Sequence, residues 1–212
     1  MKICVLAYNG MTALDAIGPF EFLRCMPGAT TFFVGEKRGE IECGGGIKLQ
    51  VDYSFLDVNS TDILIVPGGD EIQAIENSAL LKWIRKMHQE TEFTASVCTG
   101  SLILGAAGLL MGKKATTHWS QMVLLSNYGA IPSFRRVIKD GKIITSAGVS
   151  AGMDMALYII ELLAGKETAE KVQLELEYAP EPGLNSGHPS TARPAVLEAA
   201  TLGIGKGHDR NR

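Results

Sequence analysis

The stretch TASVCTGSLILGAAGLL at residues 94–110 decides the fold. Residues 94–97 predict a short strand, and the apolar residues 101–110 predict a helix that follows it at once. A strand that turns directly into a helix is the repeating unit of α/β folds. Three more short apolar runs predict further strands: residues 3–7, 30–34 and 62–66.

Helical patterns alternate with these strands. They predict a helix that begins at Gly18-Pro19 and further helices over residues 78–90, 119–127, 151–163 and 168–177. Two hairpins are predicted over residues 41–51 and 136–145. This alternation predicts a doubly wound α/β domain over residues 1–178, with a mostly parallel sheet and helices on both faces. Residues 179–212 are rich in Pro and Gly and predict a C-terminal arm or tail.

The composition excludes several classes of protein. The chain has 212 residues, of which 46% are hydrophobic and 20% charged, the balance of a globular protein rather than a disordered one. The net charge of -3 provides no global attraction to nucleic acid or to anionic membranes. The longest apolar stretch, residues 102–111, is too short for a membrane span, which needs about 20 residues. No signal-peptide pattern is present at the start, and a cytoplasmic location is expected.

Cys98 is the main candidate for chemistry. No two of the four cysteines form a CxxC pair, so a zinc ribbon or a redox dithiol is not expected. The segment Ser96-Val97-Cys98-Thr99-Gly100 has the small-x-nucleophile-x-small form of a nucleophile elbow, a tight strand-to-helix turn. Its position before a helix predicts that the helix N-terminus favours a thiolate. The alternative is a buried structural cysteine, the commonest fate of this residue type.

A thiolate that attacks an electrophilic carbon transfers negative charge to the substrate, which then needs hydrogen-bond donors. The turn Pro67-Gly68-Gly69 ends a neighbouring strand, where glycine lets the backbone approach closely. We therefore expect the amides of Gly69 and Thr99 to form an anion-binding pair. The alternative is a turn that merely ends the strand.

Two further side chains are candidates for proton transfer. Asp15 lies in the loop after the first strand, and in parallel sheets such loops meet at one edge. Beside Cys98 it would share a proton with the thiol and act as a general acid or base. The alternative is a helix-capping role. His118 follows in Thr116-Thr117-His118-Trp119 and is either a base for Cys98 or a packed histidine beneath the site.

These motifs together resemble the ThiJ/PfpI superfamily, the class I glutamine amidotransferase-like group. The resemblance rests on LIVPGG at residues 64–69, SVCTGSLILGAAGLL at 96–110 and KATTHW at 114–119, and it covers about residues 1–185. It implies a flavodoxin-like fold and, as is usual in this group, a homodimer with active sites near the interface.

Within the superfamily, LDAIGPFEFL at residues 14–23 and VQLELEYAPEPGLNSGHP at 172–189 resemble the isonitrile (isocyanide) hydratases. The resemblance implies that Cys98 attacks the isocyanide carbon of a small-molecule electrophile and that Asp15 handles the proton. A thioimidate would form and be released by water as an N-substituted formamide, with no metal or organic cofactor. One departure concerns the pocket wall, where Gly148 and Ser150 lie in AGVS instead of a Gly-Gly-Ile-Thr-like run.

Two other functions are consistent with the same sequence motifs. ATTHW and CTGSLILGAAGLL also resemble the sensor domain of AraC-type transcription regulators. Such regulators add a DNA-binding region of about a hundred residues, but only about 30 residues follow Ala179, so a stand-alone sensor is the form that fits. The third alternative is a deglycase or glyoxalase-like repair protein, or a redox sensor, that uses the same thiol.

Overall fold

A seven-stranded sheet forms the centre of the computed structural model, which describes residues 1–207. The strand order is β10-β11-β7-β6-β1-β2-β5, and every neighbouring pair is parallel except the hairpin of β10 and β11. The strands are β1 (Lys2–Leu6), β2 (Thr30–Gly35), β5 (Tyr53–Ser54), β6 (Ile63–Val66), β7 (Phe93–Val97), β10 (Val137–Asp140) and β11 (Ile143–Ser146). This topology confirms the predicted mostly parallel sheet.

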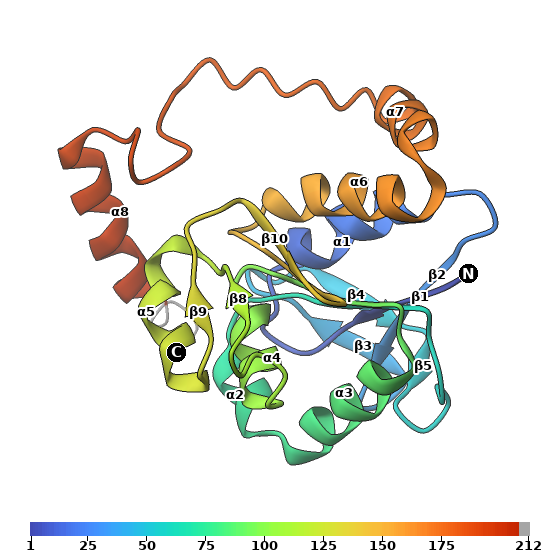
Figure 1. Ribbon diagram of the computed structural model, residues 1–212. Helices are drawn as coiled ribbons and strands as arrows, with labels where there is room; N and C mark the ends of the chain where they lie inside the picture. Colours follow the sequence, from blue (N-terminus) through green and yellow to red (C-terminus); the bar gives the residue numbers. More distant parts are fainter. Residues whose placement is uncertain (208–212) are drawn as a thin grey trace. The chain divides into compact units, whose positions relative to one another are not determined.

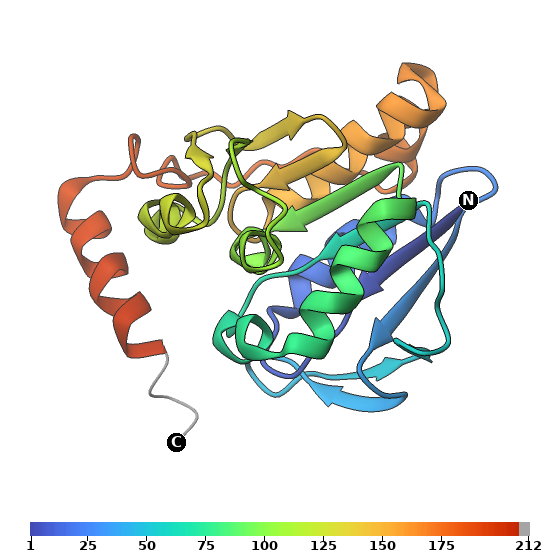
Figure 2. The same cartoon turned by 60° about the horizontal axis from the view of Figure 1, so that its bottom comes forward.

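Helices cover both faces of the sheet (Figure 1). One face carries α1 (Ala13–Leu23) and α6 (Ala151–Ala164), which pack side by side. The other face carries α2 (Glu71–Glu76), α3 (Ser78–Glu90) and α4 (Gly100–Ala106), and Figure 2 shows α3 and α4 together in front of the strands. The predicted doubly wound, flavodoxin-like architecture is therefore confirmed.

Smaller elements surround this core. They are the hairpin of β3 (Gly39–Glu42) and β4 (Lys48–Val51), the paired β8 (Lys114–Ala115) and β9 (Ile131–Pro132), the short helices η1 (Trp119–Gln121), α5 (Met122–Leu125) and η2 (Ser126–Tyr128), and α7 (Lys166–Glu175). The single helix predicted over residues 119–127 is thus a run of three short helical segments. Gly129, at φ 71°, ends this run in the left-handed region that favours glycine.

The described chain divides into two compact units, the first of which is Met1–Leu176. The second begins at Glu177 and contains α8 (Pro194–Gly207), a helix that the Pro- and Gly-rich text did not predict. The last five positions of the predicted arm, residues 208–212, lie outside the described residues.

Helix α1 begins earlier than predicted. Gly18-Pro19 does not open the helix, because Thr12 precedes its first residue and the Asp15 N–H donates to the Thr12 carbonyl at 3.0 Å. Pro19 is therefore an internal residue of α1, where its missing N–H leaves the Asp15 carbonyl without its usual intrahelical donor. The correction moves Asp15 from a loop into the first turn of a helix.

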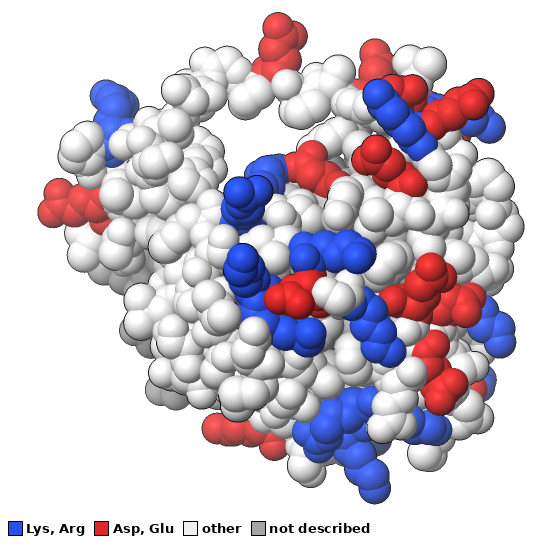
Figure 3. All heavy atoms as spheres, viewed as in Figure 1, with Lys and Arg blue, Asp and Glu red and all other residues white. Residues whose placement is uncertain are grey.

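The surface carries both signs of charge. Lys and Arg side chains are intermixed with Asp and Glu on the face drawn in Figure 3, in keeping with the small net charge. Within residues 1–207, no helix has the length and apolar content needed to cross a membrane.

Candidate active site

Cys98 occupies a strained turn between β7 and α4. Its φ of 57° lies in the left-handed region, which non-glycine residues adopt rarely and mostly at functional sites. The turn is tight, since a Cβ on Gly100 would lie only 2.1 Å from the Val66 carbonyl oxygen. The Cys98 N–H donates to the Ala147 carbonyl at 3.0 Å, and the Thr117 hydroxyl donates to the Cys98 carbonyl at 2.9 Å. The segment thus has the backbone form of the predicted nucleophile elbow.

Asp15 is fully buried beside Cys98. Its Oδ2 accepts the Gly68 N–H at 3.0 Å, while Oδ1 is buried without a nitrogen or oxygen partner in the described chain. Burial raises the pKa of Asp15 to about 7, although the bonds with Gly68 and with the Cys98 thiol act in the opposite direction. The carboxyl therefore exchanges its proton near neutral pH, and the helix-capping alternative does not fit a buried side chain whose hydrogen bond is with the Gly68 amide on another loop.

Burial of Cys98 opposes the thiolate that the helix N-terminus was expected to favour. Cys98 is only 6% exposed, and burial, with a further contribution from the negative charge of Asp15, raises its pKa to about 12. The backbone N–H groups of Thr99 and Val149 lower this pKa, but they do not outweigh burial. The helix-terminus effect is therefore present at the sulfur but too weak to ionise it at rest.

The predicted anion-binding pair of Gly69 and Thr99 amides is not assembled. The Gly69 N–H donates to the Thr99 Oγ1 at 3.0 Å. The Thr99 hydroxyl in turn donates to the Gly69 carbonyl oxygen at 3.3 Å. The amides that lower the pKa of the Cys98 thiol are those of Thr99 and Val149. The glycine turn has a different use, because a Cβ on Gly68 would lie 2.5 Å from the Thr99 nitrogen. Glycine lets this turn press against the elbow and present the Gly68 amide to Asp15.

His118 lies near the elbow, where its ring contacts Ser120 and Gly148. Its Nδ1 is paired with the Ser120 hydroxyl at 2.8 Å, and among the described contacts none joins its ring to Cys98. The ring packs so closely on Gly148 that a Cβ there would lie 2.5 Å from the His118 Cδ2. Burial lowers the pKa of His118. This placement matches the packed-histidine alternative, and Gly148 leaves room for the ring.

Three site residues were not predicted from the sequence. Val149 supplies an amide to the sulfur from a backbone at φ 34°. Glu71, at the start of α2, is buried, and its negative charge raises the pKa of Cys98. Tyr8 is buried after the end of β1, and its hydroxyl donates to the carbonyl of Pro67, which follows β6, at 3.1 Å. An amide is present in every residue type except proline, so only Glu71 and Tyr8 carried a signal, as polar residues in the segments that follow β6 and β1.

Within residues 1–207, no group of three or more His, Cys, Asp or Glu side chains is arranged to hold a metal ion. Ser150, predicted in the pocket wall, is exposed and accepts a hydrogen bond from Arg136 at 3.2 Å.

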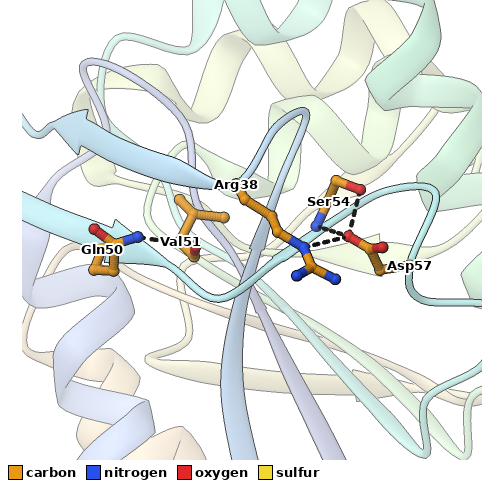
Figure 4. Close-up of polar contacts among 5 residues, drawn as sticks. All are labelled: Arg38, Gln50, Val51, Ser54 and Asp57. Carbon is orange, nitrogen blue, oxygen red and sulfur yellow. Dashed lines mark hydrogen bonds and ion pairs between the residues drawn. The ribbon is translucent and has the colours of Figure 1, made fainter.

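A hollow of about 410 Å³ opens beside the carboxyl ends of β1 and β2, and Tyr8 is part of its lining. Arg38 lines this hollow, and its Nε donates to the Asp57 Oδ2 at 2.9 Å. The same Asp57 oxygen accepts hydrogen bonds from the Ser54 amide and hydroxyl (Figure 4). None of the predicted catalytic residues lines this hollow. The chemistry therefore concentrates at the edge formed by β1, β6 and β7.

Several known proteins are similar to this chain in sequence and in fold. The model of the DJ-1/PfpI family matches residues 1–162. Isonitrile hydratase of Pseudomonas putida is 40% identical over 201 residues, which cover 94% of this chain and 88% of that protein. Deglycase PfpI of Pyrococcus furiosus is 30% identical over 149 residues, which cover 69% of this chain and 89% of that protein. The crystal structure of a ThiJ/PfpI family protein from Pseudomonas syringae superposes with a TM-score of 0.93 at 36% identity, and the match covers 97% of this chain and 86% of that one.

Proposed function

Because this chain belongs to the DJ-1/PfpI family, as its motifs predicted, we propose that it acts as an isonitrile hydratase-like enzyme with Cys98 as nucleophile and Asp15 as general acid and base. The observation that carries the proposal is the pairing of a neutral thiol on a strained elbow with a buried carboxyl whose pKa is about 7. The 40% identity to a protein named for this activity supports the same reaction.

The first half of the reaction forms a covalent adduct. The Cys98 sulfur attacks the terminal carbon of the isocyanide while Asp15 takes the thiol proton. Asp15 then delivers this proton to the same carbon, which gives the thioimidate Cys98–S–CH=N–R. A carboxyl with a pKa near 7 suits both transfers, because it accepts and releases a proton with little cost at neutral pH. The amides of Thr99 and Val149 stabilise the charge on sulfur while the proton is on Asp15.

The second half releases the product. Asp15 removes a proton from water as the water oxygen bonds to the thioimidate carbon. The carbon–sulfur bond then breaks, the imine nitrogen takes up one proton and the sulfur regains the other. The balance is one isocyanide and one water consumed and one N-substituted formamide formed, with no oxidant or cofactor.

The direct test is conversion of cyclohexyl isocyanide to its formamide by the purified protein, followed by mass spectrometry. We expect turnover by the native chain and complete loss in Cys98→Ala, together with a transient adduct on Cys98 after brief exposure. Formamide production by Cys98→Ala would disprove the nucleophile, and an inactive native chain would disprove the activity.

A deglycase-like function is the second candidate, favoured by the 30% identity to deglycase PfpI. It is tested in parallel by following the loss of methylglyoxal adducts from a model peptide. Tight binding of isocyanide without any product would point to the sensor alternative. We also propose that the chain works as a homodimer in the cytoplasm, which light scattering of the purified protein and fractionation of the source cells would test.

A further inference from the structure

The amide of Val149 interacts with the Cys98 thiol, whose pKa it lowers, from an unfavourable backbone conformation. A φ of 34° is rare for any residue with a Cβ and rarer for a β-branched one. Such a conformation persists only when the surrounding structure holds it in place. Val149 lies between the end of β11 at Ser146 and the start of α6 at Ala151, so both flanks of the segment need anchoring.

Arg136 contacts both flanks of this segment. Its backbone carbonyl accepts the Ala147 N–H at 2.9 Å, on the side of β11. Its guanidinium reaches the other side, where Nη2 donates to the Ser150 hydroxyl at 3.2 Å and Nε donates to the Asp154 carboxylate in the first turn of α6. Arg136, beside the edge strand β10, thus forms hydrogen bonds with the chain both before and after Val149.

The other bonds of the segment are of two kinds. Local turn bonds, such as Gly152 N–H to the Val149 carbonyl at 3.2 Å, move with the segment and do not fix it to the sheet. The bond from the Cys98 N–H to the Ala147 carbonyl fixes only the β11 side. Among the described side-chain hydrogen bonds of residues 1–207, those of the Arg136 guanidinium connect the α6 side to the edge of the sheet.

We propose that Arg136 is a positioning residue that holds the Val149 amide against the Cys98 sulfur. The proposal deepens the function assigned to this site and rests on Cys98 being its reactive group, whatever the substrate. A fork-shaped guanidinium suits this task because it binds two acceptors in fixed directions, whereas the single ammonium of lysine does not.

The test is amide hydrogen exchange of Val149, measured by NMR on the full chain. Arg136→Met removes the fork and keeps the length of the side chain. We expect exchange at Val149 to be about fivefold faster, the scale of a partly exposed ion-pair contact, with strands β7 and β11 unchanged. Arg135→Met is the matched control, because no side-chain hydrogen bond or ion pair of this neighbouring arginine is found within residues 1–207. Its Val149 amide should exchange as in the native chain.

Three readouts separate a positioning role from general stability. The thermal midpoint of unfolding of Arg136→Met should stay close to that of Arg135→Met. Iodoacetamide should alkylate Cys98 of Arg136→Met at a rate different from that in Arg135→Met, measured on the Cys98 peptide by mass spectrometry. With isocyanide, kcat should fall several-fold at an unchanged KM. Equal Val149 exchange in the two methionine variants, or faster exchange spread over β10 and β11, would overturn the proposal.

Two provisions keep the test decisive. If Arg136→Met does not fold, Ser150→Ala removes one acceptor of the fork and should speed Val149 exchange in the same direction by a smaller factor. If the native chain proves unable to hydrate isocyanides, only the proposed substrate fails, because exchange and alkylation need no substrate.

Discussion

Cys4 and Cys98 are both buried thiols with a raised pKa, yet only one of them is set up for chemistry. Cys4 lies within β1, between Phe32 and Leu64 of the neighbouring strands, and is fully inaccessible. Cys98 ends the same sheet at its carboxyl edge, with 6% of its surface exposed. Burial raises the pKa of both thiols, so a shifted pKa does not by itself identify a nucleophile.

The difference lies in what surrounds each sulfur. For Cys4 burial is the cause of the shift, whereas Cys98 also interacts with the charge of Asp15 and with two backbone amides. The amides stabilise a thiolate once the proton has left, and Asp15 provides a place for that proton. The comparison teaches that reactivity at this site comes from a coupled proton acceptor rather than from a thiolate formed in advance.

After the loss of Cys98 itself, removing that acceptor should have the largest effect. Asp15→Asn keeps the size of the side chain and an oxygen for the Gly68 amide but cannot take the thiol proton. We expect turnover of isocyanide to fall about 100-fold, the lower range for loss of a general acid–base group. The pH dependence of kcat/KM near pH 7 should disappear with it, because that is where Asp15 titrates.

Cys4→Ala is the matched control for this measurement. It removes a buried sulfur from the same sheet, so it should lower the free energy of unfolding by about 1 kcal/mol and leave turnover unchanged. Equal turnover in Asp15→Asn and in the native chain would remove the main difference between the two thiols.

Asp15→Asn should also stabilise the protein at alkaline pH. The pKa of Asp15 is about 7 in the folded chain against 3.8 for an ordinary Asp, so the folded state binds its proton more tightly than the unfolded state. The contribution of Asp15 to stability is therefore most favourable below about pH 4 and is lost as pH rises through 7. The rise in pKa from 3.8 to about 7 implies a gain on the order of a few kcal/mol for Asp15→Asn at pH 8.

Urea unfolding at pH 8 and at pH 4 measures this gain. The difference between Asp15→Asn and the native chain should be large at pH 8 and small at pH 4. A difference that does not change with pH would show that the folded carboxyl has an ordinary pKa, and the proton relay to Cys98 would lose its basis.

The sequence predicted the parts of the site that depend on steric rules. The elbow at Cys98 was readable because only small neighbours such as Gly100 fit so tight a turn. Asp15 was readable because loops after parallel strands meet at one edge of the sheet, even though its loop proved to be the first turn of α1. The main strands and the long helix over residues 78–90 followed from periodicity alone.

The remainder depends on contacts that sequence spacing does not contain. The Val149 amide could not be singled out, since its use comes from a backbone conformation set by distant residues. The Gly69 amide was assigned to a substrate anion because nothing in the text shows that the Thr99 hydroxyl occupies it. The thiolate was expected because the helix terminus is visible in the sequence, whereas the extent of burial around Cys98 is a property of the folded chain.

Replacement of His118 should have the smallest effect and separates the two candidate bases. In the structure the ring pairs with Ser120 and packs on Gly148, and no described hydrogen bond joins it to Cys98. His118→Asn keeps a side-chain acceptor near the Ser120 amide, and we expect kcat to stay within about threefold of the native value. Steady-state kinetics beside Asp15→Asn decide the matter. A loss in His118→Asn as large as that in Asp15→Asn would make the imidazole the base, and the contrast between Cys98 and Cys4 would then depend on a Cys–His pair.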